Sequence, residues 1–206
     1  PFEVSQAFQL IRDVALGLDY AHTRGIIHRD IKPSNLMLET DSGEAKILDL
    51  GLAKLSGASS ATLTESGIAI GTLRYMAPEQ LISENVDQRS NIYALGCTLY
   101  FMLTGQHLVG GRNMEIVAGH LAGIPLEKLA FRLNNCPETV AQIHKMVARD
   151  PNHRPQSMAE IAQWCDMQLG QVSARTDHCA PERREENIWA HTILLVVSVC
   201  AGAVSA

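Results

Sequence analysis

The residues best suited to chemistry lie in the stretch 28–35, which reads His-Arg-Asp-Ile-Lys-Pro-Ser-Asn. The carboxylate of Asp30, the ammonium of Lys32 and the amide of Asn35 fall within six residues, around a proline that disfavours a helix. A second carboxylate, Asp49, follows a short apolar run fourteen residues after Asn35. Mg²⁺ takes oxygen ligands and shares them with phosphate groups. The pattern therefore predicts a positioned loop that forms a magnesium–nucleotide site.

These residues resemble the protein kinase family, whose catalytic loop reads H-R-D-x-x-x-x-N and whose metal-binding motif is D-F-G. Residues 49–51 read Asp-Leu-Gly, so Leu50 replaces the aromatic residue of the second motif. Residues 77–79 read Ala-Pro-Glu, which is similar to the third motif in the expected order. A lysine two residues after Asp30 resembles the serine/threonine branch rather than the tyrosine branch.

The resemblance implies a role for each residue of the site. Asp30 would accept or orient the proton of the substrate hydroxyl, and Lys32 would offset charge on the transferred phosphoryl group. Asn35 and Asp49 would hold Mg²⁺, with ATP as the phosphoryl donor and proteins as substrates. Thr72 would place its hydroxyl near Asp30 and Lys32, on the shelf under the substrate. We treat these five residues as the candidate catalytic and cofactor-binding set.

Four further residues have structural roles by the same resemblance. His28 would pack beneath the metal-binding motif, and Glu79 would form a buried ion pair with Arg154. Asn91 stands where the family has an aspartate that anchors the backbone of the catalytic loop. Because charge-assisted hydrogen bonds are about twice as strong as neutral ones, we expect an anchor weaker by about 1 kcal/mol.

Residues 52–76 carry many serines and threonines and little periodicity, which predicts an irregular loop. Taken alone, it could be a plain surface linker. Its position between Asp49 and Glu79 makes it similar to the activation segment of kinases. We expect a phosphate on Thr62 or Thr64 to order this loop by pairing with Arg29.

The elements that must position these residues are mainly helical. Apolar periodicity predicts a hairpin and five helices, the second of them apolar all round and therefore buried. The predicted helices span 3–23, 86–104, 113–120, 137–149 and 157–169, and the hairpin pairs 36–38 with 45–50. The fold class is mainly α (α+β), resembling the C-terminal lobe of a kinase.

Composition narrows the function classes. The 206 residues are 46% hydrophobic and 19% charged, as expected for one globular domain. A net charge of -5 and the lack of a basic block argue against nucleic acid as a partner. The cysteines form no C-x-x-C pair, so we propose no metal site beyond magnesium.

The glycine-rich loop of kinases does not occur in this sequence. We therefore expect the resemblance to cover the larger, helical lobe, residues 1–169, without the nucleotide-capping lobe. This stretch alone would then be inactive, because positioning provides most of the catalysis in phosphoryl transfer.

The end of the chain changes composition twice. Residues 170–187 are polar and aperiodic, which predicts a linker. Residues 188–206 contain no Asp, Glu, Lys or Arg over nineteen positions, just enough for a transmembrane helix. The pair Arg183-Arg184 before it favours a single-pass protein with the kinase lobe in the cytoplasm. An apolar helix docked on the lobe is the alternative.

Two functions fit the sequence. The first is a membrane-anchored serine/threonine kinase that transfers the ATP γ-phosphoryl group to protein hydroxyls. It would be similar to the eukaryotic-type kinases of bacteria and could form a dimer. The second is a non-catalytic, kinase-like binding module, which the changes at Leu50 and Asn91 would suggest. The presence of Asp30, Lys32 and Asn35 favours the enzyme.

Overall fold

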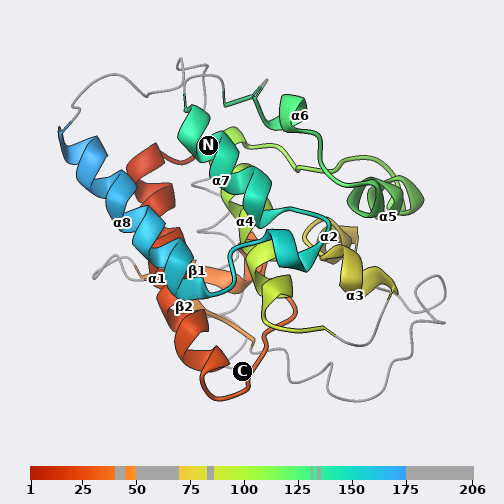
Figure 1. Ribbon diagram of the computed structural model, residues 1–206, viewed down its shortest axis with the longest axis horizontal. Helices are drawn as coiled ribbons and strands as arrows, with labels where there is room; N and C mark the ends of the chain where they lie inside the picture. The colour runs from red at the N-terminus through yellow and green to blue at the C-terminus, as the bar shows by residue number, and fades with distance from the viewer. Residues whose placement is uncertain (40–44, 50–69, 83–85, 131, 134–135, 175–206) are drawn as a thin grey trace, which may run out of the picture.

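In the computed structural model, ten helices and strands account for most of the described residues, 1–39, 45–49, 70–82, 86–130, 132–133 and 136–174 (Figure 1). Their bounds are α1 Val4–His22, β1 Leu36–Leu38, β2 Ala45–Ile47, α2 Ile70–Leu73, α3 Pro78–Ile82, α4 Arg89–Thr104, α5 Asn113–Ala122, α6 Leu126–Ala130, α7 Pro137–Met146 and α8 Met158–Ala174. Short 3-10 turns cover Pro33–Asn35 and Pro151–His153. This confirms a mainly helical lobe with a small antiparallel sheet.

Helix α4 forms the centre of the lobe. Its buried residues run without a break from Ser90 to Tyr100, as the apolar sequence predicts. Gly96 lets α7 approach closely, because a Cβ there would lie 2.8 Å from Met146 Cβ. The helix ends at Gly105, whose φ of 68° is a left-handed conformation that glycine adopts without strain.

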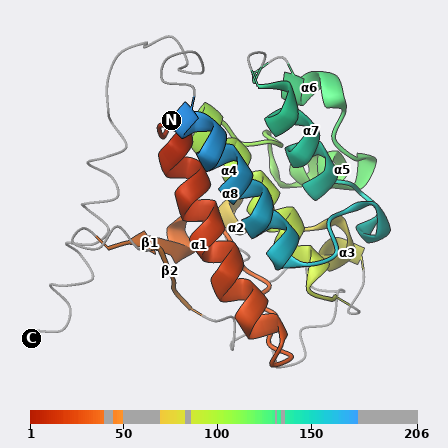
Figure 2. The same cartoon turned by 60° about the vertical axis from the view of Figure 1, so that its left-hand side comes forward.

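Helices α1 and α8 lie side by side in both views of the molecule (Figures 1 and 2). The buried face of α1 contacts α8 through Phe8, whose ring meets that of Trp164 edge to face with centroids 5.2 Å apart. Near the other end of α1, the Asp19 carboxylate accepts a hydrogen bond from Ala159 N at 3.1 Å. This contact fixes the end of α1 from which the chain continues toward residue 28.

The hairpin β1–β2 pairs Leu36 with Ile47, and Leu48 N then donates to Asn35 O at 2.8 Å. The second strand ends at Ile47, three residues before the predicted end at residue 50. Asp49 has a φ of 51°, which is incompatible with an extended strand. The hairpin therefore brings Asn35 and Asp49 to the same end of the sheet.

Three helix boundaries differ from the prediction by three residues or more. Helix α4 begins at Arg89 rather than 86, because the Asp87 carboxylate caps Arg89 N at 2.8 Å. Helix α7 ends at Met146, because Ala148 N donates to Lys145 O at 3.2 Å, three residues back, and so tightens the last turn. Helix α8 continues to Ala174, so residues 170–174 are helical where the linker was expected to begin.

The short helices α2, α3 and α6 were not predicted, since four or five residues carry no measurable periodicity. Helix α5 extends two residues past its predicted end and stops at Gly123. In the parts of the chain that the structure describes, no helix has the length and apolar character to cross a bilayer. The expected transmembrane segment, 188–206, and the loop residues Thr62 and Thr64 lie outside those parts.

Candidate active site

His28 connects the catalytic loop to the residues before Asp49. Its ring is buried, Nδ1 accepts a hydrogen bond from Asp30 N at 3.3 Å, and Nε2 lies 3.0 Å from Leu48 O. A main-chain N–H can only donate and a carbonyl can only accept, so His28 carries its proton on Nε2. The ring thus links the backbone of Asp30 to the carbonyl of Leu48, the residue before Asp49, and so holds together the two segments that carry the acidic residues.

Asp30, Lys32 and Thr72 form a hydrogen-bonded chain. Lys32 Nζ lies 2.9 Å from Asp30 Oδ2 and 2.9 Å from Thr72 Oγ1. Asn35 Nδ2 also donates to Asp30 Oδ2 at 3.2 Å and to Asp30 O at 2.8 Å. Both side-chain donors therefore use the same carboxylate oxygen, Oδ2. Among the described residues nothing donates to Oδ1, so this oxygen is free to accept a hydrogen bond.

Asn35 and Asp49 could hold a magnesium ion. The amide nitrogen of Asn35 is used by Asp30, which leaves its Oδ1 as an acceptor. The Asp49 side chain is exposed and follows Leu48, the residue bound to Asn35 O. An amide oxygen and an exposed carboxylate are ligand types that fit Mg²⁺, which completes its coordination with phosphate oxygens and water. Within the described ranges, no group of three or more His, Cys, Asp or Glu forms another candidate metal site.

The loop backbone is anchored on both sides of Arg29. Arg29 N donates to Asn91 Oδ1 at 3.0 Å, and Arg29 O accepts from Gln80 Nε2 at 3.0 Å. Arg29 has a φ of 64°, a strained conformation for a residue with a side chain, and these two bonds hold it there. The anchor by Asn91 is thus present, and its amide replaces a carboxylate without loss of the contact.

Gln80 was missed in the sequence analysis. Its oxygen accepts from Ala77 N at 3.0 Å while its nitrogen binds Arg29 O, so one side chain joins the Ala-Pro-Glu segment to the catalytic loop. Its position directly after Glu79 was the only available signal, and an amide there does not by itself indicate a partner 51 residues away.

The structure brings Glu79 and Arg154 together. The two guanidinium nitrogens lie 2.7 and 2.8 Å from the two carboxylate oxygens, in fork geometry. Arg154 also donates to the carbonyls of Ala148, Arg89 and Arg149, and its side chain is fully buried. The pair joins α3, which follows the substrate shelf, to the turn before α8.

His120 of α5 is a buried polar group near the shelf. Its Nδ1 lies 2.7 Å from the Tyr93 hydroxyl, and its Nε2 has no hydrogen-bond partner among the described residues. Burial lowers the pKa of His120 to about 4, although the main chain at Arg74 and Leu73 opposes the shift. His120 is therefore neutral in the folded protein.

We expect His120 to make the protein acid-labile. The usual pKa of 6.5 applies after unfolding, so the stabilisation is present above pH 6.5 and is lost as the pH falls toward about 4. Between pH 7.5 and 5, His120→Gln should lose about 2 kcal/mol less unfolding free energy than the unaltered chain, at ~1.4 kcal/mol per pKa unit. Urea unfolding at both pH values measures this. Replacing the exposed His153 by Gln is the control; equal pH dependence in all three proteins would contradict the role of His120.

A family comparison agrees with this geometry. The chain belongs to the protein kinase family, since the model of the protein kinase domain matches residues 1–165.

The relatives are bacterial kinases. The chain is 34% identical over 162 residues to the serine/threonine-protein kinase PknB of Mycolicibacterium smegmatis, which is 78% of this chain and 26% of that protein. It is 40% identical over 145 residues to a protein of Streptomyces coelicolor named "Probable serine/threonine-protein kinase", covering 70% of this chain and 21% of that protein. It is also 33% identical over 162 residues to PknB of Mycobacterium tuberculosis, covering 78% and 26% of the two chains. The chain therefore spans about a quarter of the length of these relatives.

Proposed function

We propose that this lobe, as part of the kinase that carries it, binds protein substrates and takes part in the transfer of the γ-phosphoryl group of ATP to their serine and threonine hydroxyls. The observation that supports this most is the bridge from Lys32 Nζ to Asp30 Oδ2 and Thr72 Oγ1, at 2.9 Å each. This bridge supports the proposal because a carboxylate, an ammonium and a hydroxyl meet there, although Thr72 lies 40 residues after Lys32.

Each side chain then has a distinct task. Asp30 Oδ1 accepts the hydrogen bond of the incoming hydroxyl and orients it for in-line attack. Lys32 holds Asp30 through its hydrogen bond to Oδ2 and offsets negative charge on the phosphoryl group. Asn35 and Asp49 would hold Mg²⁺–ATP, which supplies the phosphoryl group and the metal charge.

The test is transfer of labelled γ-phosphate from Mg²⁺–ATP by the kinase that carries this lobe. Peptides identical except for a serine, threonine or tyrosine acceptor serve as substrates. We expect label on serine and threonine and none on tyrosine. Nucleotide binding without transfer to any acceptor would instead indicate the kinase-like binding module.

We also propose that residues 188–206 anchor the protein in a membrane, because the stretch lacks charged residues apart from one histidine. The intact chain should remain in the membrane pellet after alkaline extraction, and a chain ending at Asn187 should be soluble. Leu194→Arg is the matched control, since a charge at mid-span costs about 2.5 to 3.5 kcal/mol of insertion. A soluble intact chain would rule out the anchor.

We propose that Arg29 binds a phosphate on the loop that contains Thr62 and Thr64. Within the described residues, its guanidinium has no ion-pair partner, while its backbone is fixed by Asn91 and Gln80. A phosphate would accept two parallel hydrogen bonds from the guanidinium, in fork geometry. Dephosphorylation should then lower turnover about tenfold, the equivalent of one charge-assisted hydrogen bond.

Turnover before and after phosphatase treatment measures this effect. Arg29→Ala should abolish the difference, whereas Arg24→Ala, which removes an exposed arginine stacked on Tyr20, should preserve it. If Arg29→Ala still responded fully to phosphatase, Arg29 would have only a structural role.

A further inference from the structure

Asn91, which anchors the catalytic loop, is itself in contact with His22, a residue that lies outside the site. Asn91 is 1% exposed, and its amide has two partners. Its Oδ1 accepts from Arg29 N at 3.0 Å, and its Nδ2 lies 2.9 Å from His22 Nε2. Because the main-chain N–H of Arg29 can only donate, the amide orientation is fixed, with Nδ2 toward His22. His22 Nε2 must then be the acceptor, so its proton is on Nδ1.

We propose that His22 is a positioning residue for the catalytic loop and that it supports Asn91 only in its neutral form. Its importance for phosphoryl transfer rests on the proposed function, but the hydrogen-bond switch itself does not. A protonated His22 would present an N–H to the N–H of Asn91. If the amide rotated to accept from His22, it would turn its NH₂ toward Arg29 N. An amide has one acceptor atom, so it cannot serve two donors in these positions at once.

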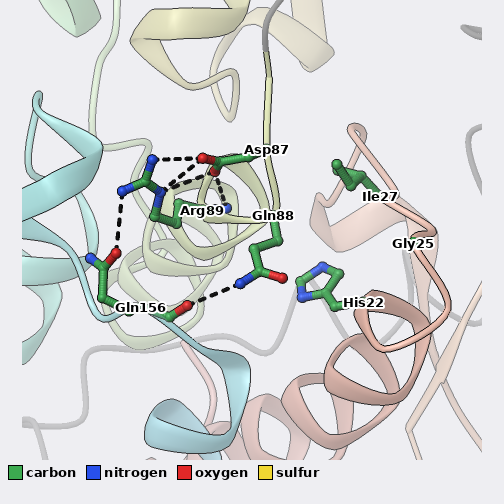
Figure 3. Close-up of a pocket in the computed structure, with 7 residues that line it drawn as sticks. All are labelled: His22, Gly25, Ile27, Asp87, Gln88, Arg89 and Gln156. Atoms are coloured by element: carbon green, nitrogen blue, oxygen red, sulfur yellow. Dashed lines mark hydrogen bonds and ion pairs between the residues drawn. The ribbon is translucent and has the colours of Figure 1, made fainter.

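His22 can exchange a proton with solvent through a cavity of about 380 Å³ behind the catalytic loop. Figure 3 shows His22 at its edge, facing the side chain of Gln88, with Arg89 and Gln156 across the opening. The cavity is separate from Asp30 and from the hairpin. Its effect on the loop would pass through the contacts from His22 to Asn91 and from Asn91 to Arg29.

Burial sets the direction of the pKa shift of His22, and the charges around the ring oppose it. Asp19 on α1 and Asp87 before α4 raise the pKa of His22, but burial outweighs them and lowers it below 6.5. Asp87 is paired with Arg89, the cation of α4 that lines the cavity, while Gln156 on the α8 side is neutral. His22 is therefore neutral at pH 7.5, and its support of Asn91 is lost as the pH falls through its pKa.

The substitution Asn91→Asp provides a sharp test, because a carboxylate has acceptors for both neighbours. It would bind Arg29 N and the protonated His22 together, as a charge-assisted pair. The variant should therefore raise the pKa of His22 and retain the anchor in acid. His22→Gln offers an acceptor that does not titrate, and His22→Ala offers none.

The experiment follows the ring nitrogens of His22 and the amide exchange of Arg29 by NMR in the 206-residue chain, between pH 7.5 and 5. We expect the Nδ1–H tautomer at pH 7.5 in the unaltered protein. Exchange at Arg29, corrected for its intrinsic pH dependence, should rise roughly fivefold in acid, as for the loss of one hydrogen bond. It should stay constant in Asn91→Asp and His22→Gln and be fast at both pH values in His22→Ala.

Three results would overturn the proposal. One is an Nε2–H tautomer of His22 in the unaltered chain at pH 7.5, which needs no variant. Another is Arg29 exchange that does not respond to pH in the unaltered chain. The third is the same acid response in Asn91→Asp. None of these readouts depends on ATP, so they separate this proposal from the proposed kinase activity.

Discussion

Replacing Asp30 by asparagine is expected to lower kcat by about 10²- to 10⁴-fold, the usual contribution of general acid–base catalysis. Lys32 and Asn35 both donate to Asp30 Oδ2, so in the variant the amide oxygen must take that position. The amide NH₂ then occupies the place of Oδ1. It would offer a donor to the substrate hydroxyl where an acceptor is required.

The binding of Mg²⁺–ATP should change little, because Asn35 and Asp49 are intact. Measuring kcat beside the nucleotide Kd therefore separates loss of chemistry from loss of binding. Asp166→Asn, at an exposed aspartate of α8, is the matched control and should leave both unchanged. If Asp30→Asn kept more than about half of the turnover, Asp30 would not be the group that orients the hydroxyl.

Replacing Arg154 by methionine should lower the free energy of unfolding by about 3–5 kcal/mol, because it leaves the largely buried Glu79 carboxylate without its partner. The variant also leaves the carbonyls of Ala148, Arg89 and Arg149 without the donors that Arg154 supplies. Methionine retains most of the apolar stem, so the loss measures the head group rather than a cavity.

Urea unfolding of a double-mutant cycle with Glu79→Leu isolates the pair. The double variant should be more stable than Arg154→Met alone, since no buried charge then lacks a partner. Arg112→Met is the control: Arg112 pairs with Glu115 at 3.3 Å with 92% of its side chain exposed, and such pairs contribute at most about 1 kcal/mol. A loss no greater in Arg154→Met than in Arg112→Met would contradict the structural role.

The sequence alone was sufficient to predict the fold and the site where the residues involved are close together in the chain. Asp30, Lys32 and Asn35 are close in the chain, and a proline disfavours an α-helix through them, so a short motif predicts their convergence. The apolar residues of α4 leave no polar face, which requires burial on every side. The two short apolar stretches 36–38 and 45–50 likewise predict the hairpin that brings Asn35 toward Asp49.

Only the tertiary structure decided the contacts between distant residues. Lys32 reaches Thr72, and Asn91 lies between Arg29 and His22, which are 62 and 69 residues away in sequence. Gln80 and His22 have no local pattern, because a hydrogen bond depends on atomic positions fixed by the packing of α1, α3 and α4. The start of α4 and the end of α7 were misplaced because periodicity does not report main-chain hydrogen bonds. The Asp87 carboxylate accepts from Arg89 N, and Ala148 N bonds to Lys145 O in a tighter turn.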